Sequence, residues 1–425
     1  MLHRSPLPLR PGSPSPLHFH TWWAALAGLC ASLVGIGLGR FAYTPLIPAL
    51  VAAGWFTPSQ AVYLGAANLA GYLVGALAAR RLTARWGTRS VLRGMMLLAS
   101  ASFFGCAAHL PFAWYFSWRL AAGAAGGSIM VLAATAILPH VAPNRRGLVG
   151  GFIFTGVGLG IAASGTLVPL LLVNGLVPTW CAIGELSGLL TALAWNGWPQ
   201  DTVPSGPGSV SAVRVGRTKS LAVNTLILGY GLNAVGLVPH MIFLAVFVAR
   251  GLGLGIEAGS HEWVLYGLGA MAGPLVAGRL ADVLGFAAAL RASFLLQAVA
   301  VALPAFTTAP GWLAASSIVV GGFTPGIVAL ALGRLQELIG PDVAEQRRAW
   351  GRATISFALF QAAAAYGYSF LFARMNDAYG LIFMIASAAT MLALLLDVAV
   401  SIAARARPPC ITPVARVRAG RRRRS

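Results

Sequence analysis

Long apolar segments separated by short polar gaps run along almost the whole chain. Twelve of them reach the length of about 20 residues that a helix needs to cross the hydrocarbon layer of a membrane. The pattern therefore predicts an all-α membrane protein with twelve transmembrane helices. Their approximate limits are 24–50, 60–80, 91–109, 112–138, 148–173, 177–198, 221–249, 262–281, 286–308, 312–335, 353–373 and 379–402.

One gap is much longer than the others and divides the chain into two halves of six segments each. It reads PQDTVPSGPGSVSAVRVGRTK and has the Pro, Gly, Ser and basic residues of a linker. The N-terminal tail has neither the apolar region nor the cleavage site of a signal peptide. We expect disordered tails at 1–21 and 404–425, six-helix bundles over 22–198 and 220–403, and a linker over 199–219.

The two halves carry a weak internal repeat. GIGLGRFAYTP, which starts at Gly35, aligns with GYGLNAVGLVP, which starts at Gly229. The first span of one half therefore corresponds in direction to the first span of the other. Parallel halves of this kind are typical of transporters whose central site lies between the halves near the middle of the membrane.

Composition and charge agree with a membrane protein. The chain is 58% hydrophobic and 9% charged, with a mean hydropathy of +0.77, which excludes a soluble enzyme. The formal net charge of +20 does not indicate nucleic acid, because the basic residues lie in the C-terminal tail and in short gaps. With the N-terminus inside, the outer loops hold only Arg250 and Arg374, so both termini are expected in the cytoplasm, in a bacterial inner membrane.

The gap after the eighth span contains a loop motif. It reads GRLADVLG from Gly278 to Gly285, with Asp282 at its centre. The matching gap after the second span has Arg80 and Ala84 in place of the first glycine and the aspartate. It keeps three residues of the pattern, Arg85, Gly87 and Arg89.

This motif resembles the G-x-x-x-D-x-x-G loop signature of the major facilitator superfamily, and with the twelve spans the resemblance covers residues 22–403. Spans one, seven and eight, together with Gln361 in span eleven, resemble the YbfB/YjiJ-like branch. The chain differs from that branch at His240 and Met241. The resemblance implies the major facilitator fold of two six-helix bundles and transport by alternating access, without a cofactor.

Asp282 is expected to act in the gate between the two halves. Its carboxylate can accept from the N-terminal amides of span eleven, or pair with Arg347, Arg348 or Arg352. The alternative is an acidic residue that only helps to fix topology or keep the loop soluble.

Two arginines lie inside spans, where an unpaired charge costs several kcal/mol. Arg40 is expected to face the central cavity, and its alternative role is to bridge buried carbonyl groups. Arg119, followed by Gly123, resembles the fourth-span signature of the superfamily, whose arginine is linked to proton coupling. Its alternative is a side chain that snorkels to the outer interface.

Other polar side chains complete the candidate pathway. Tyr43 and Asn233 are expected to orient a solute by hydrogen bonds. His240 in span seven is a candidate proton carrier, and the alternative is a histidine bonded to a backbone carbonyl. Glu262 lies at the outer mouth of span eight, either as part of a solvated rim or, if turned inward, as a proton carrier.

These features favour a secondary active transporter for one small solute, with the proton as the coupling ion. Arg40 and Arg119 favour an anionic or carboxylate-bearing metabolite. Drug or metabolite efflux stays open, as do a membrane-embedded enzyme and a non-transporting sensor or scaffold. We expect a monomer that binds membrane lipid and that binds no nucleic acid, metal or cofactor. The basic tail either holds anionic lipid or is a solvated tail that only helps to fix topology.

Overall fold

The computed structural model describes residues 16–200, 217–375 and 379–405, and in these ranges the chain forms helices and no strand. The linker expected over 199–219 and both tails lie largely outside the described residues. The helices of the first half are α1 (Pro16–Ser32), η1 (Leu33–Phe41), α2 (Leu46–Ala52), α3 (Pro58–Trp86), α4 (Thr88–Gly105), α5 (Phe112–Ile137), η2 (Leu138–His140), η3 (Pro143–Arg145), α6 (Arg146–Gly165), α7 (Leu167–Leu172) and α8 (Leu176–Ala194).

The second half has the same succession of long helices. They are α9 (Arg217–Ile242), α10 (Leu244–Val246), η4 (Phe247–Gly251), α11 (Gly255–Leu284), α12 (Phe286–Phe306), α13 (Pro310–Ile339), α14 (Val343–Arg374) and α15 (Tyr379–Arg405).

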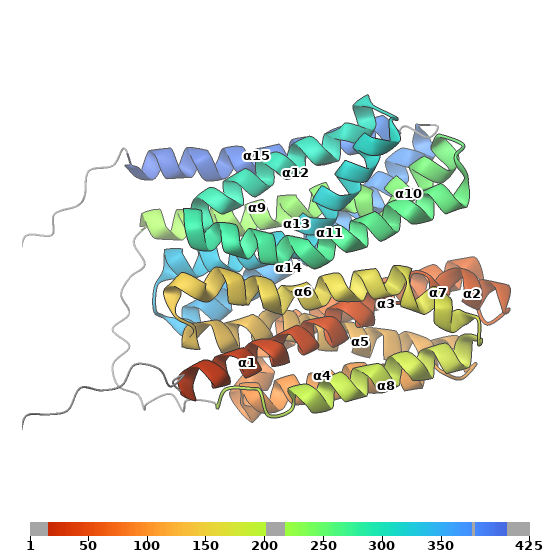
Figure 1. Ribbon diagram of the computed structural model, residues 1–425, viewed down its shortest axis with the longest axis horizontal. Helices are drawn as coiled ribbons and strands as arrows, with labels where there is room; N and C mark the ends of the chain where they lie inside the picture. The colour runs from red at the N-terminus through yellow and green to blue at the C-terminus, as the bar shows by residue number, and fades with distance from the viewer. Residues whose placement is uncertain (1–15, 201–216, 376–378, 406–425) are drawn as a thin grey trace, which may run out of the picture.

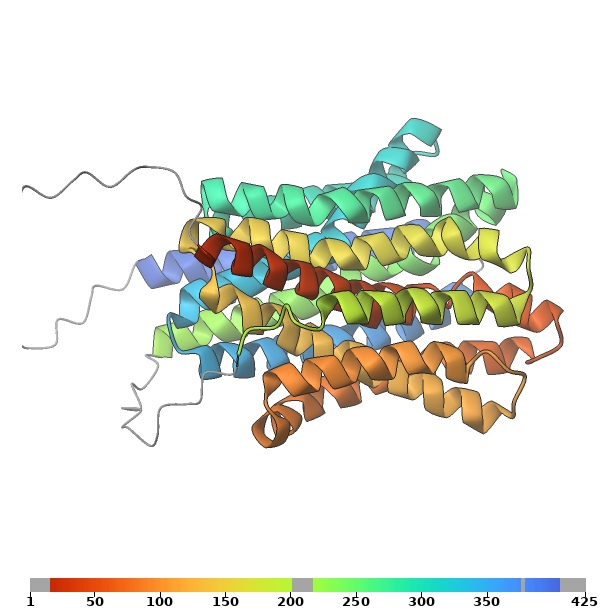
Figure 2. The same ribbon diagram turned by 60° about the horizontal axis from the view of Figure 1, so that its bottom comes forward.

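The helices run along one direction in two side-by-side bundles (Figure 1). The red to yellow helices of the first half form the lower bundle, and the green to blue helices of the second half form the upper one. α1 begins and α15 ends at the same end of the molecule in both views (Figure 2). We call this the terminal end, and the other the distal end.

Ten helical segments in the described part of the chain are long and apolar enough to cross a membrane. The remaining two long helices, α3 and α4, fall outside that group. Both nevertheless pack against α5 in the same bundle. The all-α membrane architecture is confirmed, and the arrangement is consistent with twelve spans.

Several helix limits differ from the sequence expectation. The first span is not one helix, because a π-helical segment and a turn at residues 42–45 separate α1 from α2. α1 begins within the tail expected over 1–21. α14 begins at Val343 rather than near 353, since Asp342 accepts from the backbone N–H of Glu345 and caps the helix.

Glycines set how closely the helices approach, as is typical of helix pairs in membranes. A Cβ atom on Gly75 of α3 would lie 1.9 Å from the carbonyl oxygen of Ala124 in α5. A Cβ on Gly269 of α11 would lie 2.0 Å from the carbonyl oxygen of Ile318 in α13. The α3–α5 pair in one half therefore corresponds to the α11–α13 pair in the other.

The two halves meet mainly along α6 and α11. A Cβ on Gly151 would lie 2.1 Å from the carbonyl oxygen of Pro274, and one on Gly158 would lie 1.9 Å from that of Ala270. This backbone-to-backbone contact leaves no room for side chains. Along this stretch the backbones pack directly, and the polar contact between α6 and α11 lies at their terminal end, where Asp282 accepts from two α6 amides.

Candidate functional site

Arg40, at the end of η1, and Gln361, in the middle of α14, join the two halves. The guanidinium of Arg40, in η1, donates to Oε1 of Gln361, in α14, over 2.7 Å. Gln361 also approaches the sulfur of Met241, in α9, with its amide nitrogen at 3.6 Å. Arg40 is partly buried and Gln361 is buried. The structure thus brings together two residues that the sequence places 321 positions apart.

The backbone around Arg40 is irregular. η1 is a π-helix, a form that occurs often at functional sites, and it ends at Phe41 before a turn. The carbonyl of Gly39 therefore accepts from side chains of two other helices. Arg119 Nη1 donates to it at 3.1 Å and Asn68 Nδ2 at 3.3 Å.

Arg119 is enclosed by the first half. It is 2% exposed, and its guanidinium lies 4.2 Å from the ring centroid of Tyr43. The hydroxyl of Tyr43 donates to the carbonyl of Ala61 at 2.7 Å. Arg119 therefore does not snorkel to the outer interface. Tyr43 holds Arg119 through its ring, and its hydroxyl is engaged by the backbone.

Two tyrosines that the sequence did not indicate lie near Arg40, and a third lies near one of them. Tyr72 in α3 and Tyr266 in α11 lie within electrostatic range of Arg40, and Tyr230 in α9 lies within range of Tyr72. Tyr266 forms a 2.5 Å hydrogen bond with Thr324. The sequence could have indicated these residues only as tyrosines in the middle of apolar spans. That signal is weak, because tyrosine also occurs in protein interiors without a functional role.

Asn233 and Tyr230 supply hydrogen-bonding groups without protein partners. Asn233 is fully buried, and neither its amide nitrogen nor its amide oxygen has a hydrogen-bond partner among the described residues. The hydroxyl of Tyr230, one turn earlier in α9, is likewise unpaired within the described chain. Buried polar atoms of this kind are costly unless a ligand or water satisfies them.

His240 and Glu262 contact neighbouring serines of α13. Nε2 of His240 lies 2.7 Å from Oγ of Ser316, and the Nδ1 atom has no partner among the described residues. The hydroxyl of Ser317 donates to the carboxylate of Glu262. Glu262 is 6% exposed, so the interpretation as a solvated rim is wrong. α11 turns this side chain toward α13.

Asp282 closes the terminal end, although with a different partner from the expected one. Its two carboxylate oxygens accept from the backbone N–H groups of Gly147 and Leu148, each at 2.8 Å. These amides begin α6, which is span five, and not span eleven. The reason is that α11 packs along α6, where a Cβ on Gly278 would lie 2.2 Å from the carbonyl oxygen of Gly147.

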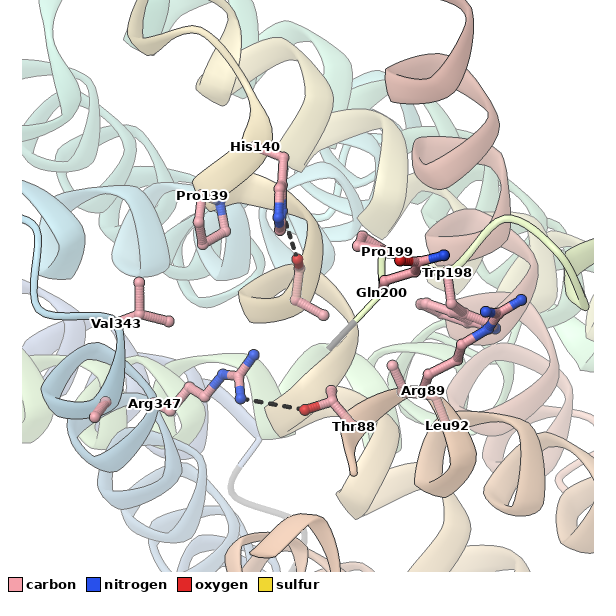
Figure 3. Close-up of a pocket in the computed structure, with 12 residues that line it drawn as sticks. Thr88, Arg89, Leu92, Pro139, His140, Trp198, Pro199, Gln200, Val343 and Arg347 are labelled. Atoms are coloured by element: carbon pink, nitrogen blue, oxygen red, sulfur yellow. Dashed lines mark hydrogen bonds between the residues drawn. The ribbon is translucent and has the colours of Figure 1, made fainter. Parts of the chain in front are cut away.

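The two loops of the motif have the same backbone turn. Gly87 ends α3 with φ +75°, and Gly285 ends α11 with φ +83°, a region that favours glycine. The guanidinium of Arg85 lies 5.7 Å from the ring centroid of Trp86. Arg89 lines a cavity of about 320 Å³ at the terminal end, in which Arg347 points across the halves and donates to Thr88 (Figure 3).

The charge of the central region is strongly unbalanced. In the part of the chain that the structure describes, neither Arg40 nor Arg119 forms an ion pair with a carboxylate. Their partners there are neutral oxygen atoms and aromatic rings. Within the same ranges, no three His, Cys, Asp or Glu side chains gather as a metal site would require.

Residues 32–398 match the family described as uncharacterised MFS-type transporter YbfB. The chain belongs to this family. The resemblance to the major facilitator superfamily and to its YbfB-like branch is thereby confirmed. The family and the fold are those of a transporter and not of an enzyme.

One curated relative is the chloramphenicol resistance protein of Streptomyces lividans. It is 26% identical over 266 residues, which cover 60% of this chain and 66% of the relative. The match therefore spans slightly less than two thirds of that relative.

Solved structures of transporters share the fold. The proton:xylose symporter XylE has a TM-score of 0.68 at 16% identity, with 89% of this chain and 95% of that chain covered. The human organic anion transporter MFSD10 has a TM-score of 0.71 at 15% identity, with 90% and 100% covered. The E. coli fucose:proton symporter FucP has a TM-score of 0.67 at 13% identity, with 88% of this chain and 98% of that chain covered.

Proposed function

We propose that the chain is a secondary active transporter that binds a small anionic or carboxylate-bearing metabolite at Arg40, between its two halves. The observation that supports this proposal best is the position of Arg40. Its guanidinium bridges the halves through neutral Gln361 and has no carboxylate partner among the described residues. A cation within the membrane span that has no counter-ion is unfavourable even when only partly buried, and an anionic solute supplies the missing charge.

The planar guanidinium suits a carboxylate, because two parallel N–H groups donate to its two oxygens. When it binds, such a solute replaces the Gln361 amide as the hydrogen-bond partner of Arg40. The unpaired groups of Asn233 and Tyr230 supply further hydrogen bonds where the solute extends toward α9. Because Arg40 and Gln361 lie in opposite halves, solute binding and movement of the halves are coupled at this point.

The proton is the proposed coupling ion. Two buried groups can carry it, His240 at Ser316 and Glu262 at Ser317. The two serines are neighbours in α13, so both candidate groups contact the same helix turn of the second half. Protonation of Glu262 changes its hydrogen bond from Ser317, which gives a proton a way to act on the packing of that bundle. In His240, Nε2 donates to Ser316, whose own hydroxyl donates to Ala300, so a proton is taken up at Nδ1 and adds a charge beside α13.

The proposal is tested with the full chain reconstituted in proteoliposomes. Panels of organic acids and lipophilic cations are offered under a proton gradient, and uptake and export are measured. We expect organic acids to be transported and Arg40→Ala to abolish their transport. Arg291→Ala is the matched control, because Arg291 pairs with Asp397 at 2.6 Å within the second half. Transport of cations alone, unaffected by Arg40→Ala, would refute the proposal.

Drug efflux is a second candidate, and the chloramphenicol resistance relative favours it. If the chain exports chloramphenicol-like compounds, its expression raises the inhibitory concentration of such drugs, and Arg40→Ala has little effect because those compounds carry no carboxylate. A chain that exports only organic acids leaves drug sensitivity unchanged.

We further propose that the protein works as a monomer in a bacterial inner membrane, with the terminal end in the cytoplasm. The basic residues of the α3–α4 and α13–α14 connections lie at that end, as the positive-inside rule requires. Labelling of single cysteines in intact cells tests the orientation. A cysteine at exposed Arg250, in η4 at the distal end, is expected to react with an impermeant reagent from outside.

A further inference from the structure

A groove of about 840 Å³ lies between α3 of the first half and α14 of the second, near the terminal end. Its polar part is lined by four arginines, Arg80 from α3 and Arg347, Arg348 and Arg352 from α14. Its apolar part includes Leu77, whose side chain is 57% exposed. The groove therefore combines a basic region with an apolar wall on the outer surface of the bundle.

The positive charge of Arg80, Arg348 and Arg352 is poorly compensated. No aspartate or glutamate is found among the described residues that line the groove. Arg352 donates to neutral Asn224 at 2.7 Å. Arg348 lies 3.5 Å from Glu345 in an exposed pair, a type of contact that contributes little.

The internal repeat explains why this groove exists. The pair Arg80 and Ala84 occupies the positions that Gly278 and Asp282 occupy in the second half, at the same distance before Gly87 and Gly285. Gly278 lets α11 touch the backbone of α6, and Asp282 fills that junction with a carboxylate. In the first half, the bulk of Arg80 replaces the glycine and the methyl group of Ala84 replaces the carboxylate. The junction between α11 and α6 is therefore closed and holds a carboxylate, and the junction between α3 and α14 is open and basic.

We propose that an anionic phospholipid of the leaflet at the terminal end occupies this groove and supplies the negative charge that Ala84 lacks. Its phosphate lies among Arg80, Arg348 and Arg352, and an acyl chain covers the wall that includes Leu77 and Ile355. The apolar wall and its exposed position on the bundle favour a lipid over a soluble anion. Because α3 and α14 belong to different halves, the lipid bridges them as Asp282 bridges α11 and α6.

The test uses the purified full chain in detergent and native mass spectrometry with added phosphatidylglycerol or phosphatidylcholine. We expect phosphatidylglycerol to be retained at least about tenfold better. Ala84→Asp is expected to lower this retention about tenfold, because it provides the carboxylate itself. Ala84→Asn, of the same size but neutral, keeps the retention. Arg334→Ala is the charge control, since Arg334 pairs with Glu337 elsewhere at the same end.

Three results would overturn the proposal. One is equal retention of the two lipids, and another is equal retention by Ala84→Asp and Ala84→Asn. The third is displacement of phosphatidylglycerol by the same concentration of inorganic phosphate, which would mean a site for a soluble anion. Thermal unfolding of each variant without lipid separates loss of binding from loss of fold. No transport is measured, so failure here is distinct from failure of the proposed function.

Discussion

Arg40 donates a 2.7 Å hydrogen bond to Gln361 across the boundary between the two halves. One residue lies in a π-helical segment of the first half, and the other in the long helix α14 of the second. A side-chain contact that joins two moving bodies must break or change when they move. The contact between Arg40 and Gln361 therefore depends both on a bound solute and on the relative position of the two halves.

Gln361→Glu places a carboxylate beside Arg40 and is expected to compete with an anionic solute. Counterflow in proteoliposomes is expected to show a KM about tenfold higher, equivalent to ~1.4 kcal/mol. Gln361→Met, of similar size and without charge, is expected to have the smaller effect. A lower KM in Gln361→Glu would indicate a cationic solute instead.

Arg119→Ala is expected to destabilise the first half by about 1–3 kcal/mol. The variant removes the hydrogen bond to the Gly39 carbonyl and the contact with the Tyr43 ring. Thermal unfolding in detergent measures the loss. Arg250→Ala, at an exposed position, is the control and is expected to change stability by less than about 0.5 kcal/mol. Equal stability of both variants would contradict a structural role for Arg119.

Asp282→Asn is expected to loosen the terminal end. It removes the charge that the two amides at the start of α6 bind, while the side-chain size stays the same. A single cysteine at Ala136, which is buried in the wall of the 320 Å³ cavity at the terminal end, is expected to react with a thiol reagent severalfold faster in this variant. Asp397→Asn, whose native pair lies within the second half, is expected to leave that rate unchanged.

His240→Ala is expected to weaken accumulation against a gradient more than it weakens downhill exchange. Coupling needs a titrating group, while exchange needs only a binding site. Uptake and counterflow are measured over a pH series in the same vesicles, with Glu262→Gln tested in parallel. Equal loss of both modes in His240→Ala means that the histidine only packs against Ser316. Selective loss in Glu262→Gln assigns the proton to the carboxylate.

The loop motif after the eighth span was predictable from the sequence in part. The loop motif from Gly278 to Gly285 predicted a carboxylate, Asp282, in the gate between the halves. Gly285 does adopt a positive φ, and Asp282 does join the halves. The partner was wrong, because the choice between the starts of spans five and eleven depends on which helix packs beside α11.

The sequence by itself determined the membrane class, the succession of long helices and the family, because apolar length and local motifs are properties of neighbouring residues. Only the tertiary structure decided the partners of Arg40, Glu262 and Asp282. Helices such as α5 are apolar on nearly every side, so their sequence does not define which face turns inward. Close glycine contacts between α11 and α13 fix such a rotation and bring Glu262 to Ser317, and packing between the two halves brings Arg40 to Gln361.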